Sequence, residues 1–156
     1  ASQSGRAMAM LLVDLDHFKE VNDRLGHEAG DRVLKNVAVQ LLSEPFANQL
    51  SARLGGDEFV MVIENEALLL DLEGSMQQLL DKLRMEIGEG EDRMQVSATI
   101  GAAWLTHENN ERSALMRCAD HALYQAKRKE RGTSTICSEA VAGERLTLRP
   151  QLRAVG

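Results

Sequence analysis

Two adjacent glycines near the middle of the chain constrain its fold more than any other feature. Gly55 and Gly56 separate two short strand-like runs, and two carboxylates, Asp57 and Glu58, follow at once. Tight two-residue turns need positive φ angles, so the pattern predicts a β-hairpin over residues 51–63. Bare glycines also leave backbone N–H groups open to an anion such as phosphate; the alternative is an exposed turn with solvated acids.

The hydrophobic pattern on either side of the hairpin predicts alternating strands and helices. The other predicted strands cover residues 8–13, 94–105 and 133–137. The predicted helices cover residues 17–25, 32–42, 68–87 and 113–129, with loops at 26–31 and 43–50. The direct hairpin excludes an all-parallel doubly wound sheet and predicts an α+β, ferredoxin-like domain, with an antiparallel core sheet covered by helices. We expect a domain over residues 1–138 and a tail or linker over residues 139–156, which show no periodic pattern.

Acidic residues stand at two places in the predicted sheet, the end of the first strand and the turn of the hairpin. The first strand is apolar on both alternating faces and runs directly into Asp14 and Asp16, which period-2 alternation places on one face. Carboxylates that end a buried strand are costly unless paired or metal-bound, although Asp16 is also well placed to cap the next helix. If the hairpin strand lies beside a central first strand, Asp14, Asp57 and Glu58 meet at one sheet edge. Carboxylates on adjacent strands suit Mg²⁺, which commonly holds nucleotide phosphates.

Basic residues late in the chain form a second candidate group. Lys127 and Arg131 lie four residues apart and would share one face of a helix, which suits a phosphate clamp. The alternative is a solvated helix end whose positive charge complements the helix dipole. The sequence shows no EF-hand, P-loop or zinc-ligand spacing.

Composition narrows the classes of partner. The formal charge of −6 argues against nucleic-acid or anionic-membrane binding, which need a basic surface. No apolar run is long enough to span a bilayer and no signal peptide is visible, so we expect a cytoplasmic protein without membrane contact from this segment. Cys118 and Cys137 suggest no disulfide framework, which fits a reducing compartment.

Four segments, in order, resemble the GGDEF domain of diguanylate cyclases. They are residues 14–23 (DLDHFKEVND), 26–31 (GHEAGD), 53–59 (RLGGDEF) and 119–127 (ADHALYQAK). The resemblance extends over about residues 8–137. It implies a palm-like α+β domain that condenses two GTP molecules into cyclic di-GMP and two pyrophosphates in bacterial second-messenger signalling.

The resemblance also implies roles for individual residues. The cofactor would be Mg²⁺, with Mn²⁺ as an alternative, and the implied metal ligands are Asp14, the Leu15 carbonyl, Asp57 and Glu58. The implied catalytic residues are Asp57, Glu58, Asp14 and Lys19, with Glu58 assisting the metal or acting as base for the 3′-hydroxyl. The implied GTP contacts are Asn22 and Asp31 at guanine, Lys19, Lys127, Arg131 and the backbone of His17 and Phe18 at the phosphates, and Gly55 and Gly56 against the nucleotide. Because one domain binds one GTP, turnover needs a homodimer, and the domain would belong to a longer sensor or multidomain protein.

Three departures from the family pattern qualify this reading. Residues 46–49 (FANQ) replace the usual inhibitory Arg-x-x-Asp site, so we expect no product inhibition there. The family's leading helix and its motif do not occur before Met8. Glu130 places an acid beside the expected phosphate clamp. The alternative function is a catalytically silent GGDEF-like regulatory module that binds GTP or a protein partner.

Overall fold

The computed structural model describes residues 7–105 and 111–137. The strands are β1 (Ala9–Asp16), β2 (Leu50–Gly55), β3 (Glu58–Ile63), β4 (Met85–Ile87), β5 (Met94–Trp104) and β6 (Ser134–Ile136). The helices are α1 (Phe18–Leu25), α2 (His27–Leu41), α3 (Glu66–Leu70), α4 (Leu72–Leu83) and α5 (Arg112–Lys129), with a 3₁₀ turn, η2, at Gly90–Asp92. The predicted tail, residues 139–156, lies outside the described residues.

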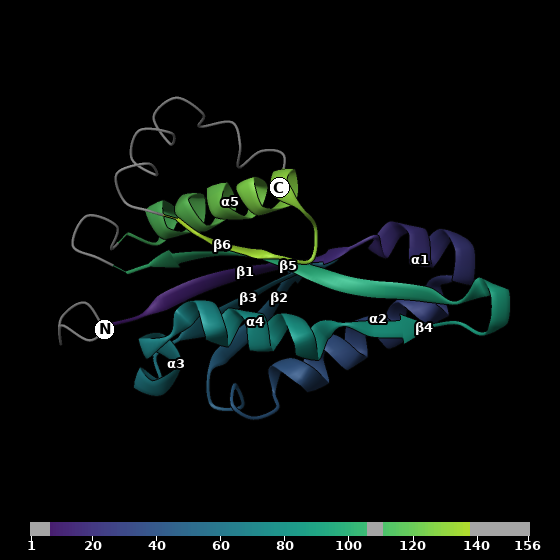
Figure 1. The fold of residues 1–156 in the computed structure, drawn as a ribbon, viewed down its shortest axis with the longest axis horizontal. Coiled ribbons are helices and arrows are strands. Elements are labelled where there is room, and N and C mark those ends of the chain that lie inside the picture. Colours follow the sequence, from purple (N-terminus) through teal and green to yellow (C-terminus); the bar gives the residue numbers. More distant parts are fainter. Residues whose placement is uncertain (1–6, 106–110, 138–156) are drawn as a thin grey trace.

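One six-stranded sheet organises the molecule, with β1 near its centre (Figure 1). The strand order is β2-β3-β1-β5-β4, and β6 joins the sheet beside β5. β1 is antiparallel to β3 on one side and to β5 on the other, whereas β6 is parallel to β5. β2 and β3 pair antiparallel across the glycine turn. This mixed sheet, covered by helices, confirms the predicted α+β class.

Helices cover both faces of the sheet, and the alternation along β1 decides which residues meet them (Figure 1). Leu11, Val13 and Leu15 belong to the larger core, with buried residues of α2 and α4. Leu12 belongs to a second core with Leu115, Cys118 and other buried residues of α5. Helix α5 also lies very close to β5, because a Cβ on Gly101 would come within 2.6 Å of Leu123 Cα. The absence of a side chain at Gly101 therefore allows α5 to pack this close to the sheet.

The predicted loop over residues 26–31 is wrong. Gly26 alone, with φ 91°, reverses the chain between α1 and α2, and α2 begins at His27. The two glycines and the polar residues of this stretch suggest a loop, but the second glycine, Gly30, is a buried residue inside the helix. Side-chain packing at Gly30 explains why glycine is there, as described below.

The predicted single helix over residues 68–87 is also wrong. The Asp71 backbone (φ −137°) interrupts the helix, and its carboxylate accepts a hydrogen bond from Gly74 N at 3.0 Å to start α4. The segment Met85–Ile87 leaves the helix altogether and pairs with β5 as strand β4. A three-residue strand carries too little alternation to be separated from the end of a helical pattern.

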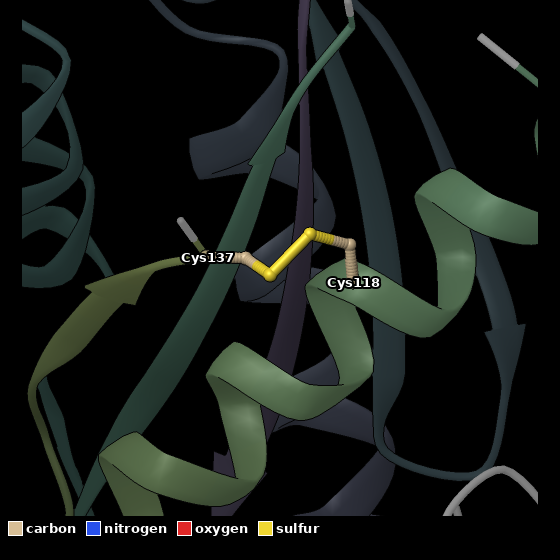
Figure 2. The surroundings of a disulfide bond; sticks show 2 residues. All are labelled: Cys118 and Cys137. Carbon is tan, nitrogen blue, oxygen red and sulfur yellow. A yellow bond between two sulfur atoms is a disulfide. The ribbon is translucent and has the colours of Figure 1, made fainter. Parts of the chain in front are cut away.

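The two cysteines correct a further expectation, because they form a disulfide. Cys118 of α5 and Cys137, which follows β6, are joined across the contact between these elements (Figure 2). Their separation of 19 residues resembles no familiar cysteine pattern, and only the packing of β6 beside α5 brings them together. The argument for a reducing compartment from cysteine usage therefore loses its basis. Among the described helices, none combines the length and the apolar character needed to cross a bilayer.

Candidate functional site

The register between β1 and β3 brings the two acidic sites together. Asp14 lies directly opposite Glu58 in the antiparallel pair. One residue further along β1, the Leu15 amide donates a hydrogen bond to the Asp57 carbonyl at 3.0 Å. Acids that are more than 40 positions apart in the sequence therefore stand at one end of two neighbouring strands.

Asp14 is the most constrained of these acids. Its side chain is buried, and Oδ2 forms an ion pair with Lys127 Nζ of α5. Its other oxygen, Oδ1, is buried and has no hydrogen-bond partner among the described residues. An unpartnered buried carboxylate oxygen is unfavourable, and a cation bound there would satisfy it.

The side chains of the site fit a divalent metal only as part of a mixed ligand set. Within residues 7–105 and 111–137, no three His, Cys, Asp or Glu side chains stand close enough to hold a metal ion by themselves. Mg²⁺ is usually bound by one or two protein carboxylates, with phosphate and water oxygens completing the shell. Asp14 Oδ1, the neighbouring acids and the Leu15 carbonyl suit that kind of incomplete protein site.

Glu58 lies in an environment that favours its protonated form. Burial raises the pKa of the Glu58 carboxyl above its ordinary value of 4.5, and the negative charges of Asp120 and then Asp57 raise it further. Asp120, on α5, is thus an acid of this site to which the sequence pattern assigns no role. The signal was present, because Asp120 and Lys127 lie seven residues apart and share one face of a helix.

The basic residues approach the acids from α5 and from the turn that follows it. Burial lowers the pKa of the Lys127 ammonium below its ordinary value of 10.5, and the positive charge of Arg131 lowers it further. Arg131 lies beyond the end of α5, where its Nη1 is 3.6 Å from Asp16 Oδ1. Glu130, which interrupts the basic run, is exposed.

Asp16 does not cap a helix, contrary to one interpretation of the sequence. The N-cap of α1 is His17, in a left-handed conformation (φ 61°), and its side chain makes no capping hydrogen bond. The Asp16 carboxylate is fully buried and accepts hydrogen bonds from Ser97 Oγ at 2.7 Å and Thr99 Oγ1 at 2.8 Å. Both donors lie on β5, whose place beside β1 the sequence alone does not reveal.

The predicted guanine-reading residues lie on α1 and α2, at their close contact. Asn22 of α1 sits against Gly30 of α2, and a Cβ on Gly30 would overlap Asn22 Oδ1 and lie 3.3 Å from Phe18 Cζ. Gly30 therefore leaves the room that the Asn22 amide occupies. Asp31 is the next residue of α2 and is exposed.

Four of the remaining predicted substrate residues are exposed. Lys19 and His17 are exposed at the start of α1, and His17 Nδ1 lies 3.0 Å from Glu20 Oε1. Gly55 and Gly56 are exposed and have φ angles of 142° and 51°. The Arg53 guanidinium closes this turn by donating to the Gly56 carbonyl through Nε at 3.0 Å and Nη2 at 2.7 Å. Sequence reasoning did not identify that role of Arg53.

The segment at the usual inhibitory position serves the fold. Phe46 is fully buried in the main core. Gln49 Oε1 accepts hydrogen bonds from the Glu64 and Asn65 amides at 2.8 and 3.3 Å, tying this segment to the end of β3. Neither side chain supplies the charge of an Arg-x-x-Asp site.

Comparisons with known proteins agree on one family. The family model described as "Diguanylate cyclase, GGDEF domain" matches residues 1–133. The chain is 37% identical over 138 residues to diguanylate cyclase TpbB of Pseudomonas aeruginosa, covering 87% of this chain and 32% of that protein. It is 34% identical to the response regulator PleD of Caulobacter vibrioides, covering 81% of this chain and 28% of that protein. The chain thus spans about a third of the length of these curated relatives.

Solved structures show the same likeness in three dimensions. The GGDEF domain of TpbB (YfiN) from Pseudomonas aeruginosa superposes with a TM-score of 0.78 at 35% identity, covering 88% of this chain and 86% of that chain. The active GGEEF domain of a diguanylate cyclase from Vibrio cholerae superposes with a TM-score of 0.73 at 28% identity, covering 89% of this chain and 88% of that chain.

Proposed function

This chain belongs to the GGDEF family of diguanylate cyclase domains, and we propose that it condenses two GTP molecules into cyclic di-GMP and two pyrophosphates. The observation that carries the proposal is the state of Asp14. Its buried Oδ1 has no partner among the described residues, Glu58 lies opposite it, and Lys127 pairs with its other oxygen. The site thus combines a place for a cation with an ammonium group suited to phosphate.

The acids would hold a divalent ion and receive the proton released in the reaction. Mg²⁺ or Mn²⁺, held by Asp14, the Leu15 carbonyl, Asp57 and Glu58, would lower the pKa of the 3′-hydroxyl and offset the phosphate charge. In each half-reaction the 3′-oxygen of one GTP bonds to the α-phosphorus of the other, and the bond from that phosphorus to the pyrophosphate oxygen breaks. The raised pKa of Glu58 favours its acceptance of the hydroxyl proton.

The rest of the site would bind and orient GTP. A carboxylate such as Asp31 can accept both the N1–H and N2–H of guanine, and the Asn22 amide can serve the remaining edge. Lys19, Lys127 and Arg131, with the backbone at His17 and Phe18, would contact the phosphates. The open glycine turn would lie against the nucleotide. One such site holds one GTP, so we propose that two domains face each other as a homodimer, within a longer sensor or multidomain protein.

We also propose that cyclic di-GMP does not inhibit this domain at the usual position. The buried Phe46 ring and the Gln49 hydrogen bonds to Glu64 and Asn65 support this, because both side chains already have structural roles. Added cyclic di-GMP should leave the initial rate unchanged. Strong non-competitive inhibition would refute this part of the proposal.

The second candidate function is a silent module that binds GTP or a protein partner without turnover. One observation favours it: Lys127 already pairs with Asp14, a predicted metal ligand. In this case GTP binds but no phosphoryl transfer follows.

Product analysis of an enforced dimer separates the two functions. The full chain, fused to a dimerising coiled coil, is incubated with GTP and Mg²⁺ and the nucleotides are identified by mass spectrometry. We expect cyclic di-GMP, loss of product in Asp57→Ala, and unchanged product in Asp92→Ala, which removes an exposed acid of the η2 turn. GTP binding without a cyclic product would refute the diguanylate cyclase proposal and support the silent binding module.

A further inference from the structure

We propose that Asp16 is a positioning residue that holds Arg131 at the phosphate site. This inference rests on the proposed function, in which Arg131 contacts the GTP phosphates. Asp16 itself is fully buried and would touch neither nucleotide nor metal. It would act only through the guanidinium that it faces at 3.6 Å.

The two acids of β1 and the two bases of the α5 end form matched pairs. Asp14 pairs with Lys127, and Asp16 pairs with Arg131. Lys127 lies in the last turn of α5, whereas Arg131 follows the helix, beyond its extended C-cap residue Glu130. Alternate residues of one strand thus face one base from the helix and one base from the turn after it.

Two hydroxyl groups of β5 anchor the Asp16 carboxylate. Ser97 donates to Oδ2 and Thr99 donates to Oδ1, so both carboxylate oxygens have fixed partners. Thr99 Oγ1 also accepts a hydrogen bond from the Gly132 amide at 3.0 Å. Thr99 thus connects Asp16 to the backbone immediately after Arg131, and the carboxylate and the turn are held by the same hydroxyl.

Arg131 needs such an anchor because its side chain has room to adopt another position. Its side chain is half exposed and lines a cleft of about 700 Å³ between β4, β5 and the turn after α5. Ser97 and Gly132 line the same cleft. Without the charge of Asp16, the long arginine side chain would be free to turn into this space and away from the phosphates.

Equilibrium binding tests the inference without turnover. The ligand is 3′-deoxy-GTP with Mg²⁺, which lacks the attacking hydroxyl, and the readout is the Kd of the full chain by calorimetry. We expect Asp16→Asn to raise the Kd by about tenfold or more, as expected for the loss of one charged contact. Arg131→Gln should have the same effect. The double variant should bind no more weakly than Arg131→Gln alone, because Asp16 acts through Arg131.

Two further comparisons separate positioning from a general loss of stability. Thr99→Val removes the shared hydroxyl and should weaken binding, whereas Thr99→Ser keeps it and should restore the parent Kd. These variants also cover the case in which Asp16→Asn does not fold. Ser75→Ala is the matched control, because it removes a buried hydrogen bond of 2.8 Å to Leu68 O in α3 and should leave the Kd unchanged.

Failure of the inference is distinct from failure of the proposed function. If the parent chain does not bind 3′-deoxy-GTP, the nucleotide site and this inference both fall. If the parent binds but Asp16→Asn binds equally well, Asp16 does not position Arg131. Independent, multiplicative effects of Asp16→Asn and Arg131→Gln would also overturn the inference.

Discussion

A substitution at Gly30 tests the guanine site without touching a residue proposed to contact nucleotide. In an ordinary helix interior, Gly→Ala stabilises the protein by about 1 kcal/mol. Here the added Cβ would overlap Asn22 Oδ1 and lie 2.9 Å from Asn22 Cγ. The obstructing atoms are the end of a flexible side chain, so the Asn22 amide should rotate away while the helix keeps its path. Gly30→Ala should therefore fold and yet lose the contact from Asn22 to guanine.

The expected size of the effect follows from the chemistry of that contact. A neutral hydrogen bond contributes about 1 kcal/mol, which corresponds to about a fivefold increase in Kd. Asp31→Asn should weaken binding more, because it removes charge-assisted hydrogen bonds. The assay is the Kd for 3′-deoxy-GTP and for its inosine counterpart, which lacks the 2-amino group. Gly30→Ala should keep the preference for guanine over inosine, and Asp31→Asn should lose most of it.

Asn22→Ala provides the matched comparison. It should weaken binding about as much as Gly30→Ala, and the two changes together should cost no more than either alone, because both remove the same contact. The double variant should also melt higher than Asn22→Ala, since the new methyl group no longer meets an obstacle. A stable Gly30→Ala variant with the parent Kd would refute the role of Asn22. An unfolded one would refute the argument that the amide yields.

Three further predictions concern the acid site, the core and the disulfide. The pKa of Glu58 is raised in the folded protein, so its charged form opposes folding and the parent loses stability as pH rises through that pKa. In EDTA, Glu58→Gln should therefore melt at a higher temperature than the parent at pH 7. This difference in melting temperature should disappear below the ordinary pKa of 4.5. Equal melting temperatures at both pH values would contradict this. Phe46→Ala should destabilise the chain by about 3–5 kcal/mol in urea unfolding, because the ring is fully buried, whereas an inhibitory-site role would predict a change in inhibition and little in stability. Reduction of the Cys118–Cys137 disulfide, which spans 19 residues, should lower the free energy of unfolding by about 3 kcal/mol. Free cysteines found by thiol titration of the unfolded, unreduced protein would show that the bond does not form.

Local chemistry made the centre of the fold predictable from the sequence. The glycine pair marks a reversal of the chain, and the apolar run before Asp14 marks a strand covered on both sides. These two features predict a hairpin and a central first strand. If the two strands are neighbours, as in a ferredoxin-like sheet, their acids meet at one end, and the register between β1 and β3 confirms that they are neighbours. The errors fall where the pattern is short or ambiguous. Strand β4 has three residues, and the segment around Gly30 contains loop-forming residue types inside a helix.

Contacts across the sheet explain what the sequence could not reveal. Ser97 and Thr99 carry no motif, and their partner Asp16 is more than 80 positions away. Asp120 influences Glu58 because α5 packs on that face of the sheet, a relation between elements that no single segment encodes. The disulfide depends in the same way on the position of β6 beside α5.

The two acids of β1 differ in a way that assigns them different work. Asp14 has one oxygen paired with Lys127 and one buried oxygen without a partner among the described residues. In the proposed function it would exchange partners when a cation and a phosphate bind, with Lys127 moving from the carboxylate to the phosphate. Both oxygens of Asp16 already accept hydrogen bonds from β5, and its charge faces Arg131. Exchange at Asp16 would leave a buried charge uncompensated, which is strongly unfavourable. Asp14 is thus suited to binding a cation, and Asp16 is suited to holding Arg131 in place. Because side chains alternate along a strand, both acids lie on the same face of β1, beside Lys127 and Arg131.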